Sequence, residues 1–273
     1  MEFNPFSEVA WYQLGSAYTQ LKDYSNAIWA LDYAILIDEY FSAAYFDKAY
    51  LLEKTYRYEE AIDLYLSTIE FQGAEGYTFY RAGLCHLALH QNKKALKYFT
   101  KAVQEDGELD AAYYELALLH DENESWDEAV HSINKSLELD PENLEYKFIA
   151  ADIHRRGGLL NEAAELYQGI LAQGYREPKV YLDFCDLLFD LCEFNQGVEL
   201  LEQGLEANPN SPQLFYRTAG YYFILEDQRA SFYLKKALKL DPSGRHHFYQ
   251  LFPALKENPE VKRYVKEEIG KID

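Results

Sequence analysis

The sequence has few cysteines and a single methionine. Its 273 residues include 3 cysteines, Cys85, Cys185 and Cys192. These form no CxxC pair and have no histidine at ligand spacing, which argues against a disulfide framework and against a zinc site. We expect all three thiols to be buried inside helices in a reducing compartment, and therefore a cytoplasmic protein.

The sequence also lacks long apolar runs and secretory features. No stretch of about eighteen apolar residues is present, and residues 1–20 contain no basic segment followed by an apolar core. We therefore expect a soluble chain that does not enter a membrane.

Positive charge is scarce. Lys and Arg number 26 against 46 Asp and Glu, a net charge of -20. Nucleic-acid binding needs clustered cations to neutralise phosphates, and no stretch of the chain supplies them. The acidic residues either keep a solvated surface soluble or steer a basic partner, and composition leaves both open.

What the sequence does contain is a repeated unit, seen most clearly from Asp110 to Asn143. Small residues stand at Ala117 and Ala129, with large apolar residues between them. This pattern predicts two helices joined by a turn. The second helix is expected to open with a capping box formed by Ser125 and Glu128 and to end before Pro141.

The same spacing recurs every 34 residues along the chain. One column of small residues reads Gly15, Ala49, Gly83, Ala117, Ala151, Cys185 and Ala219, and a second reads Ala27, Ala61, Ala95, Ala129, Ala163 and Gly197. Small residues at these places allow paired helices to approach closely. The pattern gives seven units: 8–41, 42–75, 76–109, 110–143, 144–177, 178–211 and 212–244.

These units resemble the tetratricopeptide repeat family. The first unit shows the resemblance most clearly. At the fixed positions of the family's repeat pattern it has the residues Trp11, Leu14, Gly15, Tyr18, Ala27 and Ala34. The resemblance covers about residues 8–244. It implies an all-α fold, a right-handed α-solenoid superhelix of antiparallel helix pairs. The sixth unit departs from the pattern with Gly197 and Gly204 in place of alanine, so we expect it to be the least stable.

The two ends differ in pattern. Pro5 stands where a preceding repeat would carry its closing proline, so residues 1–7 are interpreted as the tail of an upstream repeat, with an ordinary turn as the alternative. Residues 245–273 are expected to form C-terminal capping helices, because Phe248 and Phe252 recur at helical spacing before a final segment rich in Lys and Glu.

Histidines recur at one place in three successive units, as His86, His120 and His154. Equivalent positions in stacked helix pairs lie about two helix diameters of about 10 Å apart, too far to share one metal ion. The sequence has no HExxH, no nucleophile elbow and no glycine-rich phosphate loop. We therefore assign no catalytic residue, cofactor or metal ligand and expect a non-enzymatic protein.

The resemblance implies that the first helix of each repeat lines a concave surface. Position 5 of the units is nearly all aromatic, and nearby inner positions add further rings. The candidate peptide-binding residues are Tyr12, Phe46, Tyr50, Tyr77, Tyr80, Tyr114, Phe148, Phe189, Tyr216 and Phe223. Of two neighbours, Tyr113 is expected between the helices of its own repeat and Tyr114 on the concave surface, flanked by Tyr80 and Phe148.

Aromatic rings along a groove favour a peptide ligand, because they offer contact area with few rotatable bonds. Acidic neighbours such as Asp47 and Glu115 favour a partner with basic as well as apolar residues. Family members that bind acidic C-termini use a clamp of Lys, Asn and Arg, of which this chain keeps only Arg81 or Arg217, so we reject that activity. The alternative function is a structural spacer, or an array that forms homo-oligomers through its open N-terminal end.

Overall fold

A computed structural model describes residues 6–73 and 75–269, and within these ranges the chain is helical without any strand. The expected all-α architecture of consecutive helix pairs is confirmed. The chain divides into two compact units, Met1–Tyr146 and Lys147–Asp273, called here the N-terminal and C-terminal units. Among the described helices, none is both long enough and apolar enough to cross a membrane.

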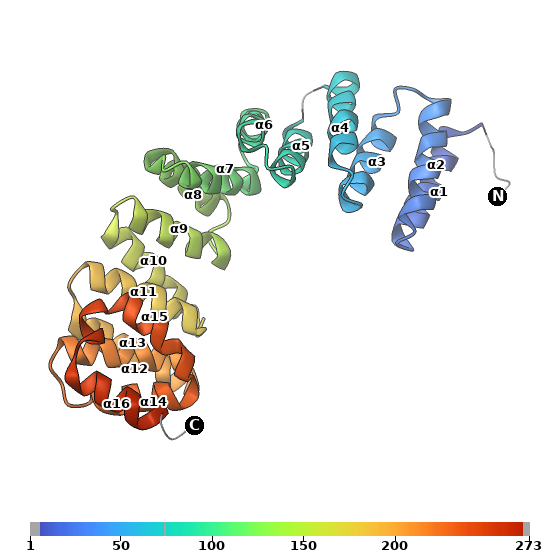
Figure 1. Ribbon diagram of the computed structural model, residues 1–273. Helices are drawn as coiled ribbons and strands as arrows, with labels where there is room; N and C mark the ends of the chain where they lie inside the picture. The colour runs from blue at the N-terminus through green and yellow to red at the C-terminus, as the bar shows by residue number, and fades with distance from the viewer. Residues whose placement is uncertain (1–5, 74, 270–273) are drawn as a thin grey trace. The chain divides into compact units, whose positions relative to one another are not determined.

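The N-terminal unit consists of four helix pairs (Figure 1). The first helices begin 34 residues apart, and each packs on its own partner. Helices α3, α5 and α7 also pack on the second helix of the preceding pair. The helices are α1 (Glu8–Gln20), α2 (Tyr24–Ile37), α3 (Ser42–Lys54), α4 (Tyr58–Gln72), α5 (Gly76–Ala88), α6 (Asn92–Glu105), α7 (Asp110–Glu122) and α8 (Trp126–Leu139).

Small residues set the distance between the two helices of a pair. Ala49, Ala61 and Ala95 are fully buried where the helices touch. A side chain added at Gly83 would place its Cβ 2.6 Å from the ring of Phe99. The two columns of small residues therefore lie in the helix contacts, where close packing requires them.

The turn inside each pair has one repeated backbone conformation. Seven residues spaced by 34 have a positive φ: Lys22, Tyr56, His90, Glu124, Gly158, Cys192 and Glu226. The N–H that follows each of them donates to a carbonyl five residues back, as from Asp23 to Tyr18 at 3.0 Å. This is the left-handed helix end that glycine normally occupies, and only Gly158 is a glycine.

Two expectations fail at these turns. Cys192 is exposed, because it occupies the left-handed position outside the helix and not an interior one. Ser125 makes no side-chain capping bond to α8, so the expected capping box is absent. Its backbone N–H instead donates to the carbonyl of His120 at 2.9 Å, closing the turn.

The C-terminal unit contains three further helix pairs and a cap. Its helices are α9 (Leu144–Arg156), which begins in the N-terminal unit, α10 (Leu160–Ala172), α11 (Pro178–Asp190), α12 (Phe194–Ala207), α13 (Pro212–Ile224), α14 (Ala230–Leu240), η1 (Pro242–Gly244), α15 (Arg245–Leu251), η2 (Pro253–Lys256) and α16 (Pro259–Ile269). Phe248 and Phe252 are buried, and α16 packs on α14 with Val261 and Tyr264 buried.

The glycines of the sixth repeat have a packing role that the sequence does not reveal. A Cβ at Gly197 would overlap the ring of Tyr221, and one at Gly204 would lie 2.8 Å from Tyr181. The sequence predicted that these two glycines lower the stability of the repeat relative to alanine. That comparison does not apply here, because alanine could not occupy either position without displacing a tyrosine ring.

Parts of both predicted ends lie outside the described residues, namely residues 1–5 of the segment 1–7 and residues 270–273 of the cap. Ser7 is the N-cap of α1, and its hydroxyl accepts a hydrogen bond from the N–H of Ala10 at 3.3 Å.

Candidate functional site

The first helices of the N-terminal unit carry a row of aromatic side chains. We call this surface the first-helix face. The Phe46 ring lies 5.9 Å from Tyr77, and the Tyr77 ring lies 6.0 Å from Tyr80. Tyr77 is 46% exposed, whereas Tyr80 also packs on the buried ring of Phe99. The rings thus connect α3 to α5 in one row, with Tyr77 the most accessible of them.

An ion pair lies beneath this row. Nη2 of Arg81 lies 2.7 Å from Oε2 of Glu53, and the two side chains are only 11% and 15% exposed. The hydroxyl of Tyr65 donates to the same carboxylate at 3.1 Å. The Arg81 guanidinium also lies 4.8 Å from the ring centroid of Tyr50. Arg81 is therefore already paired with a carboxylate of its own unit.

The α7 part of the face is acidic as well as aromatic. Tyr114 stacks on Tyr146 with centroids 5.0 Å apart, and its hydroxyl donates to Glu145 at 2.9 Å. Tyr146 donates to Asp110 at 2.8 Å. Burial, and then the Glu145 carboxylate, raise the pKa of Glu115 above its ordinary value. Tyrosine rings beside several carboxylates form a surface suited to a cationic side chain.

At the α1 end, Tyr12 is half-buried and meets Phe41 edge to face at 5.3 Å. Burial, and then a hydrogen bond to Asp47, raise the pKa of Tyr12 to about 12. The ring of Tyr12 is therefore less exposed than the ring of Tyr77.

Tyr113 has neighbours on two sides. It is half-buried and packs against the cluster of Ala95, Phe99, Leu116 and Leu119, which lies between α6 and α7. It also interacts electrostatically with Lys135 of α8, the partner helix of α7. The expectation that its ring lies between the helices of its own repeat therefore stays a prediction. The ring that stacks on Tyr114 belongs to Tyr146, a residue that sequence reasoning missed.

The remaining candidate rings belong to the C-terminal unit and have varied surroundings. Phe148 meets Tyr175 edge to face at 5.2 Å. Phe189 is partly exposed beside Phe194 and Phe252. Tyr216, in contrast, is only 5% exposed, because Phe248 of the cap packs on it and its hydroxyl donates to the carbonyl of Asp241 at 2.6 Å. Tyr216 is therefore a packing residue in this unit, and the expectation of an open ring there is corrected.

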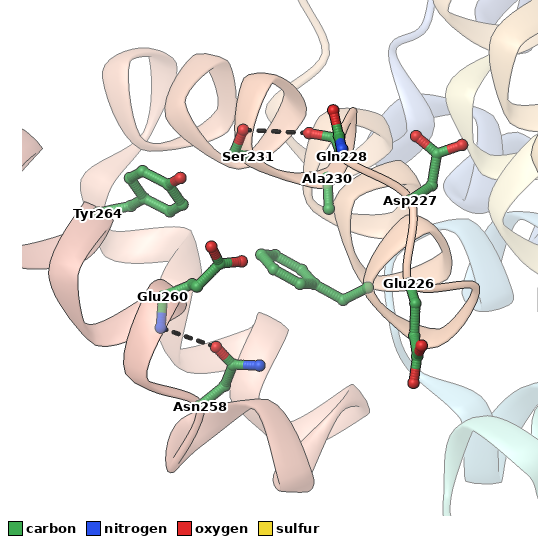
Figure 2. Close-up of a pocket in the computed structure, with 9 residues that line it drawn as sticks. Glu226, Asp227, Gln228, Ala230, Ser231, Asn258, Glu260 and Tyr264 are labelled. Carbon is green, nitrogen blue, oxygen red and sulfur yellow. Dashed lines mark hydrogen bonds between the residues drawn. The ribbon is translucent and has the colours of Figure 1, made fainter.

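Phe223 lines a pocket of about 470 Å³ between the α13–α14 turn and α16. Figure 2 shows Glu226, Asp227 and Glu260 around this pocket, with Tyr264 on α16. The lining contains three carboxylates, and Phe223, Ala230 and Tyr264 contribute apolar surface to it.

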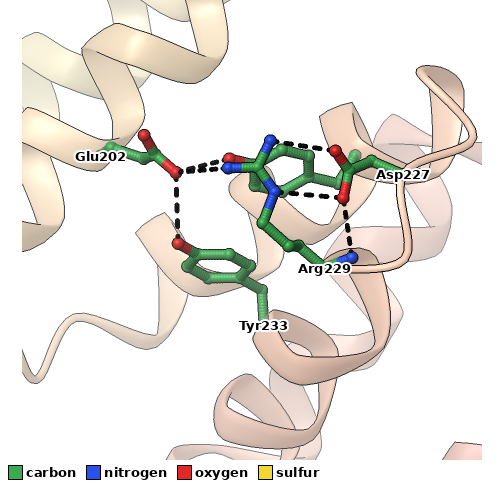
Figure 3. A network of polar contacts seen from close by, with 5 residues as sticks. Glu202, Asp227, Arg229 and Tyr233 are labelled. Carbon is green, nitrogen blue, oxygen red and sulfur yellow. Dashed lines mark hydrogen bonds and ion pairs between the residues drawn. The ribbon is translucent and has the colours of Figure 1, made fainter.

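A polar network joins three helices of the same unit. Glu202 of α12 accepts hydrogen bonds from Tyr222 at 2.5 Å and Tyr233 at 3.4 Å, and Arg229 lies 3.5 Å from it (Figure 3). Arg229 also pairs with Asp227 at 2.9 Å. Because each group in this network has a partner inside the unit, its role is to hold α12, α13 and α14 together. In the same unit Arg217 pairs with Asp186, so the second candidate clamp cation is also neutralised.

Two residues of the histidine column, His86 and His154, are buried, whereas His120 is half-buried. His86 is buried, stacks on Tyr98 at 4.9 Å and shares a hydrogen bond of 3.0 Å with Gln91. Burial lowers the pKa of both His86 and His154. Across the part of the chain that the structure describes, no cluster of three or more His, Cys, Asp or Glu side chains could hold a metal ion.

Two sequence models described as tetratricopeptide repeat match the chain, over residues 114–176 and 9–40. No curated protein matches it. Among solved structures, the C-terminal part of a TPR repeat-containing protein from Cytophaga hutchinsonii superimposes with a TM-score of 0.73 at 14% identity, covering 85% of this chain and 96% of its own.

Two other solved structures are similar. A tetratricopeptide repeat protein from Parabacteroides merdae has a TM-score of 0.59 at 16% identity and covers 96% of this chain and 98% of its own. YrrB, described as a TPR protein with an unusual peptide-binding site, has a TM-score of 0.52 at 20% identity and covers 83% of this chain and 98% of its own. These likenesses concern the fold.

Proposed function

Since the chain belongs to the tetratricopeptide repeat family, whose members are protein–protein interaction scaffolds, we propose that its N-terminal unit binds a peptide segment on the first-helix face. Members of this family are typically not enzymes, and we propose no catalytic activity for this chain. The ligand is a segment with aromatic or leucine side chains and at least one Lys or Arg.

The observation that carries the proposal is the row formed by Phe46, Tyr77 and Tyr80. Tyr77 contributes little to the core, because almost half of its surface is exposed. An exposed ring held between two other rings is pre-ordered for contact, so a ligand that packs on it loses little side-chain entropy on the protein side. Such aromatic anchors dominate the binding energy of many interfaces.

Charge supports the cationic part of the ligand. Around α7, Glu115 and Glu145 lie beside the rings of Tyr114 and Tyr146, and Asp110 is also close. Arg81, a cation of the same face, is paired with Glu53. A basic side chain therefore meets net negative charge and tyrosine rings here, whereas an acidic one would be repelled.

The test uses peptides selected from a random library for binding to the whole chain. We expect the selected peptides to contain aromatic or leucine residues together with Lys or Arg, and their binding to weaken with added salt. Replacing Tyr77→Ala should weaken such a peptide at least about fivefold, equivalent to about 1 kcal/mol. The melting temperature should change little, since the ring is half-exposed.

Tyr40→Ala is the matched control, because Tyr40 is an exposed tyrosine outside the first-helix face. It should leave affinity unchanged. If Tyr77→Ala and Tyr40→Ala bind the selected peptides equally well, or if only acidic peptides are selected, the proposal is wrong and a spacer role becomes the better explanation.

A further inference from the structure

The outer side of the first repeat is apolar and exposed. On α2, Trp29 is 46% exposed, Tyr33 38% and Leu36 78%. Trp11 of α1 stacks on Tyr33 with centroids 4.6 Å apart, and Trp29 meets Tyr33 edge to face at 4.9 Å. The rings therefore form one ordered patch. We call it, together with the uncovered side of α1, the α1/α2 face.

Nothing in the fold requires these residue types. The places 34 residues further along, in the second to sixth repeats, are almost all polar. They are Asp63, Lys97, His131, Glu165 and Glu199 for Trp29; Ser67, Lys101, Lys135, Gly169 and Gln203 for Tyr33; and Glu70, Gln104, Glu138, Ala172 and Glu206 for Leu36. A second helix of this array is thus stable with a polar outer side, and the apolar one in α2 is a property of the first repeat alone among these six.

The neighbouring side of α1 matches a surface that is covered in the other repeats of the N-terminal unit. Ala17 corresponds by the 34-residue spacing to Leu51, Cys85 and Leu119, all of which are buried. Their helices α3, α5 and α7 pack on the second helix of the preceding pair. Ala17 itself is exposed, and Leu21 just beyond it is 76% exposed. This side of α1 therefore corresponds to the surface that, in α3, α5 and α7, packs on the second helix of the preceding pair. A helix of that kind could pack on α1 in the same way.

Charge is nearly absent from this face. Among the 13 residues of α1 and the 14 of α2, Glu8 and Asp32 are the only charged ones. Asp32 is paired with Lys48 at 2.5 Å. Depletion of charge together with enrichment in Trp and Tyr is the composition of an interface core.

The second helix that best fits the α1 side is one with an apolar outer side, which α2 of another copy supplies. The last repeat cannot supply it, because α16 packs on α14. We propose that the α1/α2 face binds the same face of a second copy of this chain, so that each α2 covers the α1 of its partner. Such a same-on-same contact is two-fold symmetric and closes as a dimer.

The dependence of binding on salt concentration distinguishes this dimer from other partners of the same face. Each copy carries a net charge of -20, and Glu8, Asp23 and Asp38 lie at or near the ends of α1 and α2. Two copies therefore repel each other outside the apolar contact, and added salt should screen this repulsion and strengthen the dimer. A basic helical partner on the same face would show the opposite dependence.

The test is sedimentation velocity of the whole chain from about 1 to about 200 μM, with circular dichroism to show that each variant is folded. Trp29→Asp and Leu36→Glu install the residues that the second repeat has at the same places. We expect a concentration-dependent dimer, and a dissociation constant raised at least about tenfold by either variant. Neither change should alter peptide binding on the first-helix face, so the two proposals fail independently.

Phe232→Asp is the matched control. Phe232 is 54% exposed on α14, at the place in the last repeat that corresponds to Trp29 once its one-residue deletion is allowed for. It should leave the dimer unchanged within about twofold. The proposal is overturned if the chain stays monomeric over the whole concentration range, if Phe232→Asp weakens the dimer as much as Trp29→Asp, or if salt dissociates it.

Discussion

At the scale of single residues, the acidic side of the first-helix face has a measurable consequence. Because burial and Glu145 raise the pKa of Glu115 in the folded chain, the folded state holds a proton at pH values where the unfolded chain has lost it. Protonation of Glu115 therefore increases the free energy of unfolding as the pH falls toward the ordinary glutamate value. At neutral pH, where both states are ionised, the buried charge costs stability.

Replacing Glu115→Gln should consequently stabilise the chain at pH 7 by a fraction of the about 1.4 kcal/mol that one pKa unit represents. The gain should shrink as the pH approaches about 4, where glutamate itself becomes protonated. Thermal unfolding of both proteins across this range measures the difference. Glu70→Gln, at an exposed position on α4, serves as the control. A gain at pH 7 that is equal for both variants, or that persists at pH 4, would contradict the assignment.

At the scale of elements, two helical glycines look equivalent in sequence and differ in structure. Gly169 of α10 has no atom within 4 Å of an added Cβ, whereas a Cβ at Gly197 of α12 would overlap the Tyr221 ring. Neither residue has a positive φ. The helix contact, and not the conformation of the glycine, therefore decides what alanine would do at each position.

We expect Gly169→Ala to stabilise the chain by about 0.5–1 kcal/mol, because alanine loses less backbone entropy in a helix. Gly197→Ala should destabilise it by about 1–3 kcal/mol through overpacking against Tyr221. Denaturant unfolding of the pair checks both signs. If the two variants change the free energy of unfolding in the same direction, packing around Gly197 is not the reason for the glycine.

At the scale of the whole molecule, a repeat array owes its stability to contacts between neighbours. Helices α5 and α6 lie between covering helices on both sides, whereas no helix among the described residues covers the α1/α2 face. Backbone amides in residues 8–41 should therefore exchange faster than those in residues 76–109 when the chain is dilute. Protection in residues 8–41 should rise with concentration if the dimer forms. Equal and concentration-independent protection in both segments would count against an open first repeat.

The sequence alone determined the architecture, because a 34-residue period of small and large residues has few helical solutions. The first helices begin at residues 8, 42, 76 and 110 in the N-terminal unit, where the period puts them. Helix pairing depends on local contacts between residues close in sequence, and such contacts leave a regular pattern. The column of aromatic residues on the first helices was visible for the same reason.

Tertiary structure decided which of those rings are accessible and which polar groups are paired. The sequence predicted that Tyr77 and Tyr216 would both line the groove. In the structure the cap covers Tyr216, whereas Tyr77 stays almost half exposed within the N-terminal unit. Arg81 and Glu53 pair across 28 positions, and Tyr146 stacks on Tyr114 across 32. These contacts depend on how side chains from neighbouring repeats interdigitate. The 34-residue period predicts where the helices lie, but it does not predict which way an individual side chain points between two repeats.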